Sequence, residues 1–164
     1  MHIQWRWIHA GMFAVCAGLI IFAMYLQHAM NLEPCPMCIL QRYAFIGVGM
    51  FALLSTIHNP QRWGRWIYSG LLVVVSGLGA GVAARHTWLE HNPPQTFDCG
   101  ADLGFMVDAF PLAEALPMIF RGSGDCTEVL WRFVGLSIAE WALIWFLIFI
   151  VAGIFAATRK FDGD

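Results

Sequence analysis

A Cys-x-x-Cys motif stands immediately ahead of a long apolar run, in the stretch Cys35-Pro36-Met37-Cys38-Ile39-Leu40-Gln41-Arg42. Two cysteines at this spacing can close a small disulfide ring, hold a metal or pass electrons as a dithiol. If Pro36 begins a helix, Cys38 lies in the first turn, where unpaired N–H groups and the positive end of the helix dipole favour a thiolate. Arg42 lies one turn further along the same face, where its permanent charge would stabilise an anion beside the sulfur. The stretch therefore favours redox chemistry.

The composition indicates an integral membrane protein with the lipid bilayer as its surroundings. Hydrophobic residues make up 59% of the 164 positions and charged residues only 12%, about half the charged fraction of an average soluble chain. The net charge is -2. A nucleic-acid partner is not expected, because there is no basic surface to neutralise phosphates.

Four apolar runs are each close to the ~20 residues needed to cross the hydrocarbon core, and segments in that environment must be helical. The predicted spans are about 8–26, 39–57, 66–84 and 141–158. The predicted fold is an all-α integral membrane protein, with residues 1–164 forming a single membrane domain built as a four-transmembrane-helix bundle. The first run lacks a small-x-small cleavage site, so we expect a retained helix rather than a secretory signal.

The basic residues predict how the chain is oriented in the membrane. Loop 58–65 carries two Arg and no acid, one Arg precedes the first span, and Arg159 and Lys160 follow the last. The positive-inside rule therefore places both termini and loop 58–65 in the cytoplasm. The connections at about 27–38 and 87–140 then face the opposite side.

Four of the five cysteines fall in these two non-cytoplasmic connections. Cys35 and Cys38 belong to the first connection, and Cys99 and Cys126 belong to the second. Disulfides persist on an oxidising side of a membrane. Cys16 lies inside the first span, where we expect it to act as a small apolar side chain.

The long second connection carries apolar residues at helical spacing after the helix-breaking stretch 92–94. Leu103, Met106, Val107 and Phe110 follow this spacing, and a similar pattern continues from Leu112. The pattern predicts a short amphipathic helix on the membrane surface. A small packed cap over the bundle is the alternative.

Three interpretations of the cysteine pairs compete. A four-cysteine zinc site is disfavoured because structural zinc sites usually supply two close pairs, and Cys99 and Cys126 are far apart in the sequence; no metal is therefore expected. A structural disulfide between Cys99 and Cys126 is possible but leaves the Cys35–Cys38 pair unexplained. The third interpretation is a relay of two exchangeable disulfides, which moves oxidising equivalents through mixed disulfides.

Such a relay needs a terminal electron acceptor. A dithiol at the start of a helix in the lipid interface points to an acceptor dissolved in the bilayer, a quinone. The third span returns to the same interface and brings Arg85 and His86 to the level of Cys38 and Arg42. Arg and His side chains could hydrogen-bond quinone oxygens and help to supply protons. The alternative for Arg85 and His86 is a pair of interfacial anchors.

The Cys35–Arg42 stretch after a first span resembles the bacterial disulfide bond formation protein B family, DsbB. The stretch Ser123-Gly124-Asp125-Cys126, followed by Trp131, Phe133 and Gly135-Leu136, resembles the second loop of that family. The resemblance implies an inner-membrane thiol:quinone oxidoreductase that forms protein disulfides. Its partner would be a periplasmic thioredoxin-fold thiol oxidase of the DsbA type, and its electron acceptor ubiquinone or menaquinone.

The resemblance also implies a role for each cysteine outside the first span. Cys99 would form the mixed disulfide with the partner, and Cys126 would resolve it. Cys126 would then engage Cys35 and leave Cys38 as the thiolate facing the quinone.

Two further residues match the quinone site of the family, namely Arg42 and His86. Gln41 stands where some members have an acidic residue, so the resemblance gives it no role. The competing hypothesis from another class is a non-enzymatic membrane scaffold whose cysteines are structural staples or zinc ligands.

Overall fold

The computed structural model describes residues 5–31, 34–60, 62–92 and 131–158. This part of the chain contains the helices α1 (Trp5–Ala29), α2 (Pro36–His58), α3 (Arg62–His91) and α6 (Ile138–Thr158). It also contains a short antiparallel hairpin of β1 (Arg132–Phe133) and β2 (Leu136–Ser137), with Arg132 opposite Ser137 and Phe133 opposite Leu136. The hairpin turns at Val134 and Gly135, which both have positive φ.

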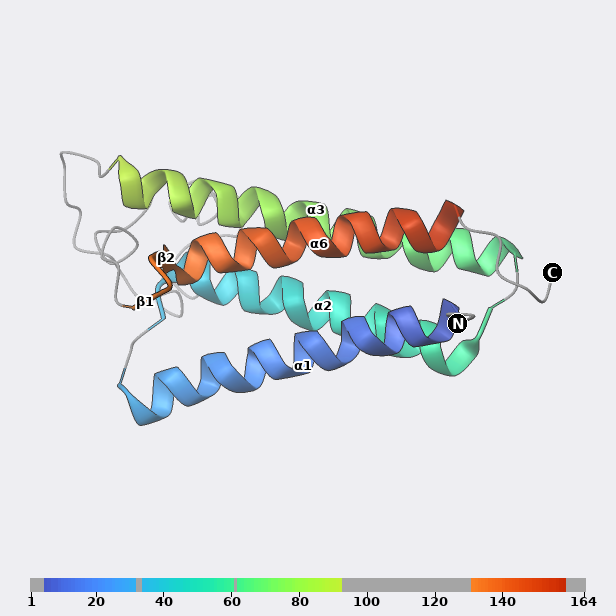
Figure 1. The fold of residues 1–164 in the computed structure, drawn as a ribbon, viewed down its shortest axis with the longest axis horizontal. Helices are drawn as coiled ribbons and strands as arrows, with labels where there is room; N and C mark the ends of the chain where they lie inside the picture. Colours follow the sequence, from blue (N-terminus) through green and yellow to red (C-terminus); the bar gives the residue numbers. More distant parts are fainter. Residues whose placement is uncertain (1–4, 32–33, 61, 93–130, 159–164) are drawn as a thin grey trace, which may run out of the picture.

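The four helices lie lengthwise beside one another, and the hairpin caps one end of the bundle (Figure 1). At this hairpin end, α1 and α3 finish while α2 and α6 begin. The most extensive packing is between α3 and α6, followed by α1 with α2 and α2 with α3. Segments far apart in the sequence therefore meet at the hairpin end.

All four helices are long and apolar enough to cross a membrane, which confirms the predicted fold class of a four-transmembrane-helix protein. Large apolar side chains point outward from the bundle, including Ile21, Leu78 and Val151, which are 68%, 68% and 66% exposed. An apolar exterior of this kind suits lipid rather than water. The predicted amphipathic helix of the second connection lies outside the described residues.

The helices extend beyond the predicted spans, because hydropathy detects only the apolar part of a helix. The third predicted span, 66–84, lies within an α3 of 30 residues. At ~1.5 Å per residue such a helix is about 45 Å long, which exceeds the ~30 Å of a hydrocarbon core. The last two turns of α3, which carry His86 and Glu90, therefore continue towards the hairpin end as a polar extension.

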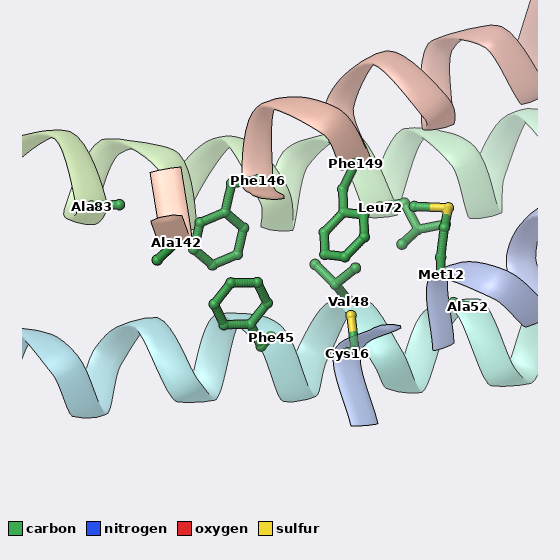
Figure 2. Close-up of a cluster of buried hydrophobic side chains, with 10 residues drawn as sticks. All are labelled: Met12, Cys16, Phe45, Val48, Ala52, Leu72, Ala83, Ala142, Phe146 and Phe149. Atoms are coloured by element: carbon green, nitrogen blue, oxygen red, sulfur yellow. The ribbon is translucent and has the colours of Figure 1, made fainter. Parts of the chain in front are cut away.

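The core of the bundle is built around a pair of stacked aromatic rings from α2 and α6 (Figure 2). Phe45 and Phe146 have ring centroids 4.1 Å apart at an interplanar angle of 13°. Phe149 meets Phe45 edge-on. Gly79 of α3 makes room for the Phe146 ring, because a Cβ at this position would lie 2.5 Å from two of its carbons. A glycine is thus what allows α3 and α6 to pack closely here.

Cys16 belongs to this core and not to the redox motif. Its side chain is 2% exposed and packs with Met12 and Val48 (Figure 2). Gly49 of α2 faces it so closely that an added Cβ would lie 3.2 Å from the Cys16 Cβ. Cys16 therefore acts as a small side chain at the contact between α1 and α2.

Candidate functional site

The Cys-x-x-Cys motif forms the N-terminus of α2. Cys35 is the N-cap residue, with φ -65° and ψ 161°, and its Sγ accepts a hydrogen bond from the Cys38 N–H at 3.3 Å. Pro36 occupies the beginning of the helix, where its fixed φ suits the first turn and its missing N–H is not needed. Cys38 consequently lies in the first turn of α2, at the positive end of the helix dipole.

The two motif sulfurs lie 3.0 Å apart, well beyond the ~2.05 Å of a disulfide bond. The two sulfurs are thus not bonded to each other in this structure. Cys35 is buried at 6% exposure against Met37 and Leu89, whereas Cys38 is only partly buried. Cys38 is the more accessible of the two sulfurs.

Arg42 reaches from α2 to the last turns of α1. Its Nη1 donates to Gln27 Oε1 at 2.5 Å and lies 3.9 Å from Met24 Sδ, and its Nη2 donates to the Ala23 carbonyl at 3.4 Å. The negative end of the α1 dipole also favours a cation here. The guanidinium is therefore held in a defined place at the hairpin end.

His86 of α3 lies among side chains from α2 and from its own helix. Its Nδ1 is 3.1 Å from Gln41 Nε2, and its Nε2 is 3.7 Å from Cys35 Sγ and 3.8 Å from Glu90 Oε1. With the Gln41 amide donating, Nδ1 is the acceptor and the ring proton resides on Nε2. The imidazole then directs its N–H towards the side that faces the Cys35 sulfur and the Glu90 carboxyl group.

Glu90 connects this histidine to the first turn of α6. Its Oε2 accepts a hydrogen bond of 2.6 Å from the Ser137 hydroxyl. Ser137 also forms a capping box with Glu140: the Ser137 Oγ accepts from the Glu140 N–H at 3.2 Å, and a Glu140 carboxylate oxygen accepts from the Ser137 N–H at 2.7 Å. The capping box that holds Ser137 at the start of α6 therefore also holds the Glu90 carboxyl group in place.

A cavity of about 530 Å³ opens between these residues. Most of its wall is apolar and aromatic, and polar side chains from α1, the start of α2, α3 and β2 also line it. The apolar lining includes Phe22, Leu26, Phe45, Ile138, Trp141 and Trp145, and the polar lining Gln27, Cys35, Cys38, Gln41, Arg42, His86, Glu90 and Ser137. Such a wall suits a flat apolar molecule that accepts hydrogen bonds at its edge.

The hairpin forms one wall of this cavity. The Trp131 and Phe133 rings stack with centroids 5.7 Å apart, and Phe22 of α1 meets Trp131 edge-on. The Trp141 indole N–H donates to the Phe133 carbonyl at 3.1 Å and ties the hairpin to α6. Aromatic side chains from three segments therefore enclose the cavity on this side.

The same residues could also ligate a metal. One ligand atom from each of Cys35, Cys38 and His86 lies within 4.8 Å of the others. Two thiolates on one tetrahedral zinc, with Zn–S bonds of ~2.3 Å, would be about 3.8 Å apart. The sulfur separation of 3.0 Å in this structure is shorter than that, so the two sulfurs would have to move apart before they could both bind the ion.

Four of the six predicted site residues line this one cavity, namely Cys35, Cys38, Arg42 and His86. The other two, Cys99 and Cys126, lie outside the described residues, so their roles stay predictions.

Sequence reasoning gave no role to Gln27, Gln41, Glu90 or Ser137, although all four line the cavity. The sequence did contain a signal for Ser137. Ser137 and Glu140 form an S-x-x-E pattern ahead of an apolar run, which is typical of a capping box at the start of a helix.

The fold and site define a class: a four-helix membrane protein with a dithiol at the start of one helix, beside an apolar cavity. The family model "Disulfide bond formation protein DsbB" matches residues 5–156. The chain therefore belongs to the DsbB family and is a multi-pass membrane protein of disulfide bond formation.

Several relatives cover nearly the whole chain, and each is named "Disulfide bond formation protein B". The relative from Aromatoleum aromaticum is 50% identical over 158 residues, which cover 96% of this chain and 95% of that protein. The relative from Marinobacter nauticus is 44% identical over 158 residues, covering 96% and 94%. The relative from Nitrosococcus oceani is 43% identical over 164 residues, covering 99% and 97%.

Proposed function

We propose that this protein is a thiol:quinone oxidoreductase, which reoxidises a periplasmic thioredoxin-fold thiol oxidase of the DsbA type and passes the electrons to a membrane quinone. The observation that carries the proposal is the position of the dithiol. Cys38 lies in the wall of an apolar cavity that also contains Arg42 and His86. A dithiol, a fixed cation and an imidazole around one cavity suit the reduction of a lipid-soluble acceptor.

The overall reaction balances in electrons and protons. The partner loses two electrons and two protons as its two thiols become one disulfide. The quinone, when bound, accepts two electrons and two protons and leaves as a quinol. The protein is oxidised and reduced in turn, so it returns to its starting state after each cycle.

The residues of the cavity fit a quinone by their chemistry. The aromatic and aliphatic lining matches an apolar ring, and Arg42 can donate hydrogen bonds to a ring oxygen. The cavity wall is largely apolar, and apolar surroundings strengthen these polar interactions.

Each polar residue at the dithiol has a task in this proposal. The N-terminus of α2 and the guanidinium of Arg42 stabilise the thiolate of Cys38. The N–H at Nε2 of His86, whose nitrogen is 3.7 Å from Cys35 Sγ, donates towards that sulfur and stabilises it as a thiolate. Gln41 holds the imidazole in place through Nδ1.

The proposal also gives roles to the two cysteines of the second connection. Cys99 forms the mixed disulfide with the partner, and Cys126 resolves it and then engages Cys35. Both act in the periplasm if the inner membrane holds the protein with its two termini in the cytoplasm, as the basic residues predict.

Quinone reduction by purified protein tests the proposal. The protein in detergent receives a reduced DsbA-type partner and a quinone, and the absorbance of the oxidised quinone is followed over time. We expect the absorbance to fall with wild type and to stay constant with Cys38→Ser. A wild-type protein that binds the partner but leaves the quinone oxidised would refute the proposal.

A metal-binding scaffold is the second candidate, favoured by the proximity of Cys35, Cys38 and His86. Titration of the reduced protein with zinc, followed by calorimetry, distinguishes the two. A scaffold would bind zinc tightly and fail to reduce quinone, whereas the proposed enzyme reduces quinone without added metal.

A further inference from the structure

The β1–β2 hairpin lines the cavity but is too short to be stable by itself. It caps the bundle where α6 begins (Figure 1), and each of its strands has two residues. A two-stranded hairpin alone in water is marginally stable at best. Phe133 and Val134 are 54% and 79% exposed, so little of the hairpin is buried. Its position must therefore depend on particular contacts with the helices.

The turn of the hairpin makes this dependence stronger. Val134 and Gly135 have φ values of 53° and 83°, and positive φ at both central residues is what a type I′ turn requires. Glycine adopts this backbone region freely, whereas a β-branched side chain such as valine is strained there. Strained residues persist where the surrounding structure holds them, and they are frequent at ligand sites. Contacts with the helices must therefore offset the strain at Val134.

Two contacts join the hairpin to two different helices. Trp141 of α6 donates its indole N–H to the Phe133 carbonyl at 3.1 Å, and the two rings lie 6.2 Å apart. Phe22 of α1 meets the ring of Trp131, the residue before β1, edge-on at 5.7 Å. All four side chains line the cavity. The Trp141 contact is the directional one, because a hydrogen bond to a carbonyl fixes the backbone of β1.

From these contacts we infer that Trp141 is a positioning residue, whose indole N–H holds the hairpin in place as a wall of the cavity and thereby raises the affinity for the quinone. The inference rests on the proposed function and names a residue that shapes its quinone site. Trp141 transfers neither electrons nor protons, so its N–H should affect KM for quinone rather than kcat.

A tryptophan near the end of a membrane helix has a simpler explanation, which the experiments must exclude. Tryptophan is favoured at the membrane interface, where its ring is apolar and its N–H meets polar groups. With only this role, Trp141 could be replaced by phenylalanine without any effect on the hairpin.

Hydrogen–deuterium exchange measures the stability of the hairpin without any quinone. The full-length protein, reduced and free of quinone in detergent, is compared with Trp141→Phe, which keeps an aromatic ring but removes the donor. The loss of one hydrogen bond changes a local opening equilibrium by roughly two- to tenfold. We expect the backbone amides of residues 131–137 to exchange faster by this factor. Equal exchange in wild type and Trp141→Phe would overturn the inference.

Trp88→Phe is the matched control, because it makes the same change at the same end of the bundle. Trp88 lies near the end of α3, is 60% exposed and is not among the residues that line the cavity. We expect wild-type exchange of residues 131–137 and a wild-type KM for quinone. If Trp88→Phe changes both as much as Trp141→Phe does, the hydrogen bond to Phe133 is not the cause and the inference is wrong.

Steady-state kinetics with varied quinone supply the second readout. We expect Trp141→Phe to raise KM for quinone by roughly two- to tenfold, the effect of one hydrogen bond, while kcat stays at the wild-type value. A lower kcat with an unchanged KM would contradict the inference, because it would place Trp141 in the chemical step.

Val134→Asn tests whether Trp141 acts through the hairpin. Asparagine tolerates positive φ, and Asn-Gly is a preferred pair for a type I′ turn, so this change stabilises the hairpin at a place remote from the indole. Added to Trp141→Phe, it should slow the amide exchange and recover part of the lost quinone affinity. A double variant with the KM of Trp141→Phe would show that the indole acts by its own contact with the quinone, and the inference would fail.

The two proposals fail separately. A wild-type protein that never reduces quinone would refute the proposed function, whatever the amide exchange shows. Quinone reduction by wild type together with unchanged exchange in Trp141→Phe would refute only the role of Trp141.

Discussion

Arg42 of α2 is anchored to α1 by Gln27, whose Oε1 accepts a hydrogen bond from the Arg42 Nη1. The Ala23 carbonyl accepts a second hydrogen bond from Nη2. Both Gln27 and Arg42 line the cavity beside the dithiol. The position of the cation therefore depends on α1 as well as on α2, and a helix without cysteines at the site contributes to its chemistry.

The first prediction concerns the charge of Arg42 itself. Arg42→Met keeps a long side chain but loses the charge and the donors. A charge-assisted hydrogen bond contributes ~1.5–3 kcal/mol, so we expect a loss of roughly ten- to a hundredfold in quinone affinity or turnover. Arg42→Lys should recover only part of the lost activity, because a lysine ammonium cannot reproduce the planar set of hydrogen-bond donors of a guanidinium. Steady-state kinetics with varied quinone measure this, and an unchanged quinone dependence in Arg42→Met would remove Arg42 from the site.

The second prediction separates the position of Arg42 from its charge. Gln27→Leu removes the side-chain acceptor of Arg42 while keeping the guanidinium, so we expect a several-fold rise in KM for quinone, corresponding to a hydrogen bond of about 1 kcal/mol or more. Gln27→Glu keeps an acceptor oxygen and serves as the matched control, with KM near the wild-type value. If Gln27→Leu has the KM of wild type, the contact to α1 does not position Arg42.

The four spans and the redox motif could be predicted from the sequence because both are local signals. An apolar run of about 20 residues has few alternatives to a membrane helix. Pro36 after Cys35 indicates the start of a helix, and α2 begins at Pro36. The spacing of Cys38 and Arg42 then places both on one face without knowledge of the remaining fold.

The polar partners of the site could not be predicted, because they depend on packing between distant segments. Ser137 follows Glu90 by 47 positions, and Gln41 precedes His86 by 45. Hydropathy does not show how each helix is rotated about its own axis, so it does not determine which side chains of neighbouring helices face each other. The predicted span 66–84 covers only the apolar part of α3, since the polar stretch from Arg85 to His91 continues the helix without continuing the apolar run.

A third prediction tests the orientation of the chain. The basic residues predict both termini in the cytoplasm. A reporter that is active only in the cytoplasm should therefore work when fused to the C-terminus. In cells, a thiol reagent that cannot cross the membrane should label Cys99 and Cys126 after reduction, while Cys16, buried in the core, stays unlabelled. Labelling of Cys99 only in inside-out vesicles would show that the chain has the opposite orientation to the predicted one.

A fourth prediction concerns the packing of α3 against α6. Gly79→Ala would place a Cβ 2.5 Å from the Phe146 ring, and overpacking of this kind costs ~1–3 kcal/mol. Gly81→Ala on the same helix is the control, because an added Cβ there meets no atom of the described residues within 4 Å, apart from its own chain neighbours and the adjacent backbone of α3. Both changes gain the same helix propensity, so their difference isolates the clash. We expect a lower unfolding temperature in detergent for Gly79→Ala than for Gly81→Ala, and equal temperatures would contradict the packing described.

The last prediction separates the two cysteine pairs. Cys99→Ser should abolish electron transfer from the partner, yet Cys35 and Cys38 should still be oxidised by quinone because the cavity is intact. Cys38→Ser should block quinone reduction, while a mixed disulfide at Cys99 can still be trapped and seen on a non-reducing gel. Cys16→Ser is the control and should keep nearly full activity, because Cys16 lies in the core against Gly49 and is not among the residues that line the cavity. If Cys16→Ser inactivates the protein as severely as Cys38→Ser while the protein remains folded, the assignment of the cysteine roles is wrong.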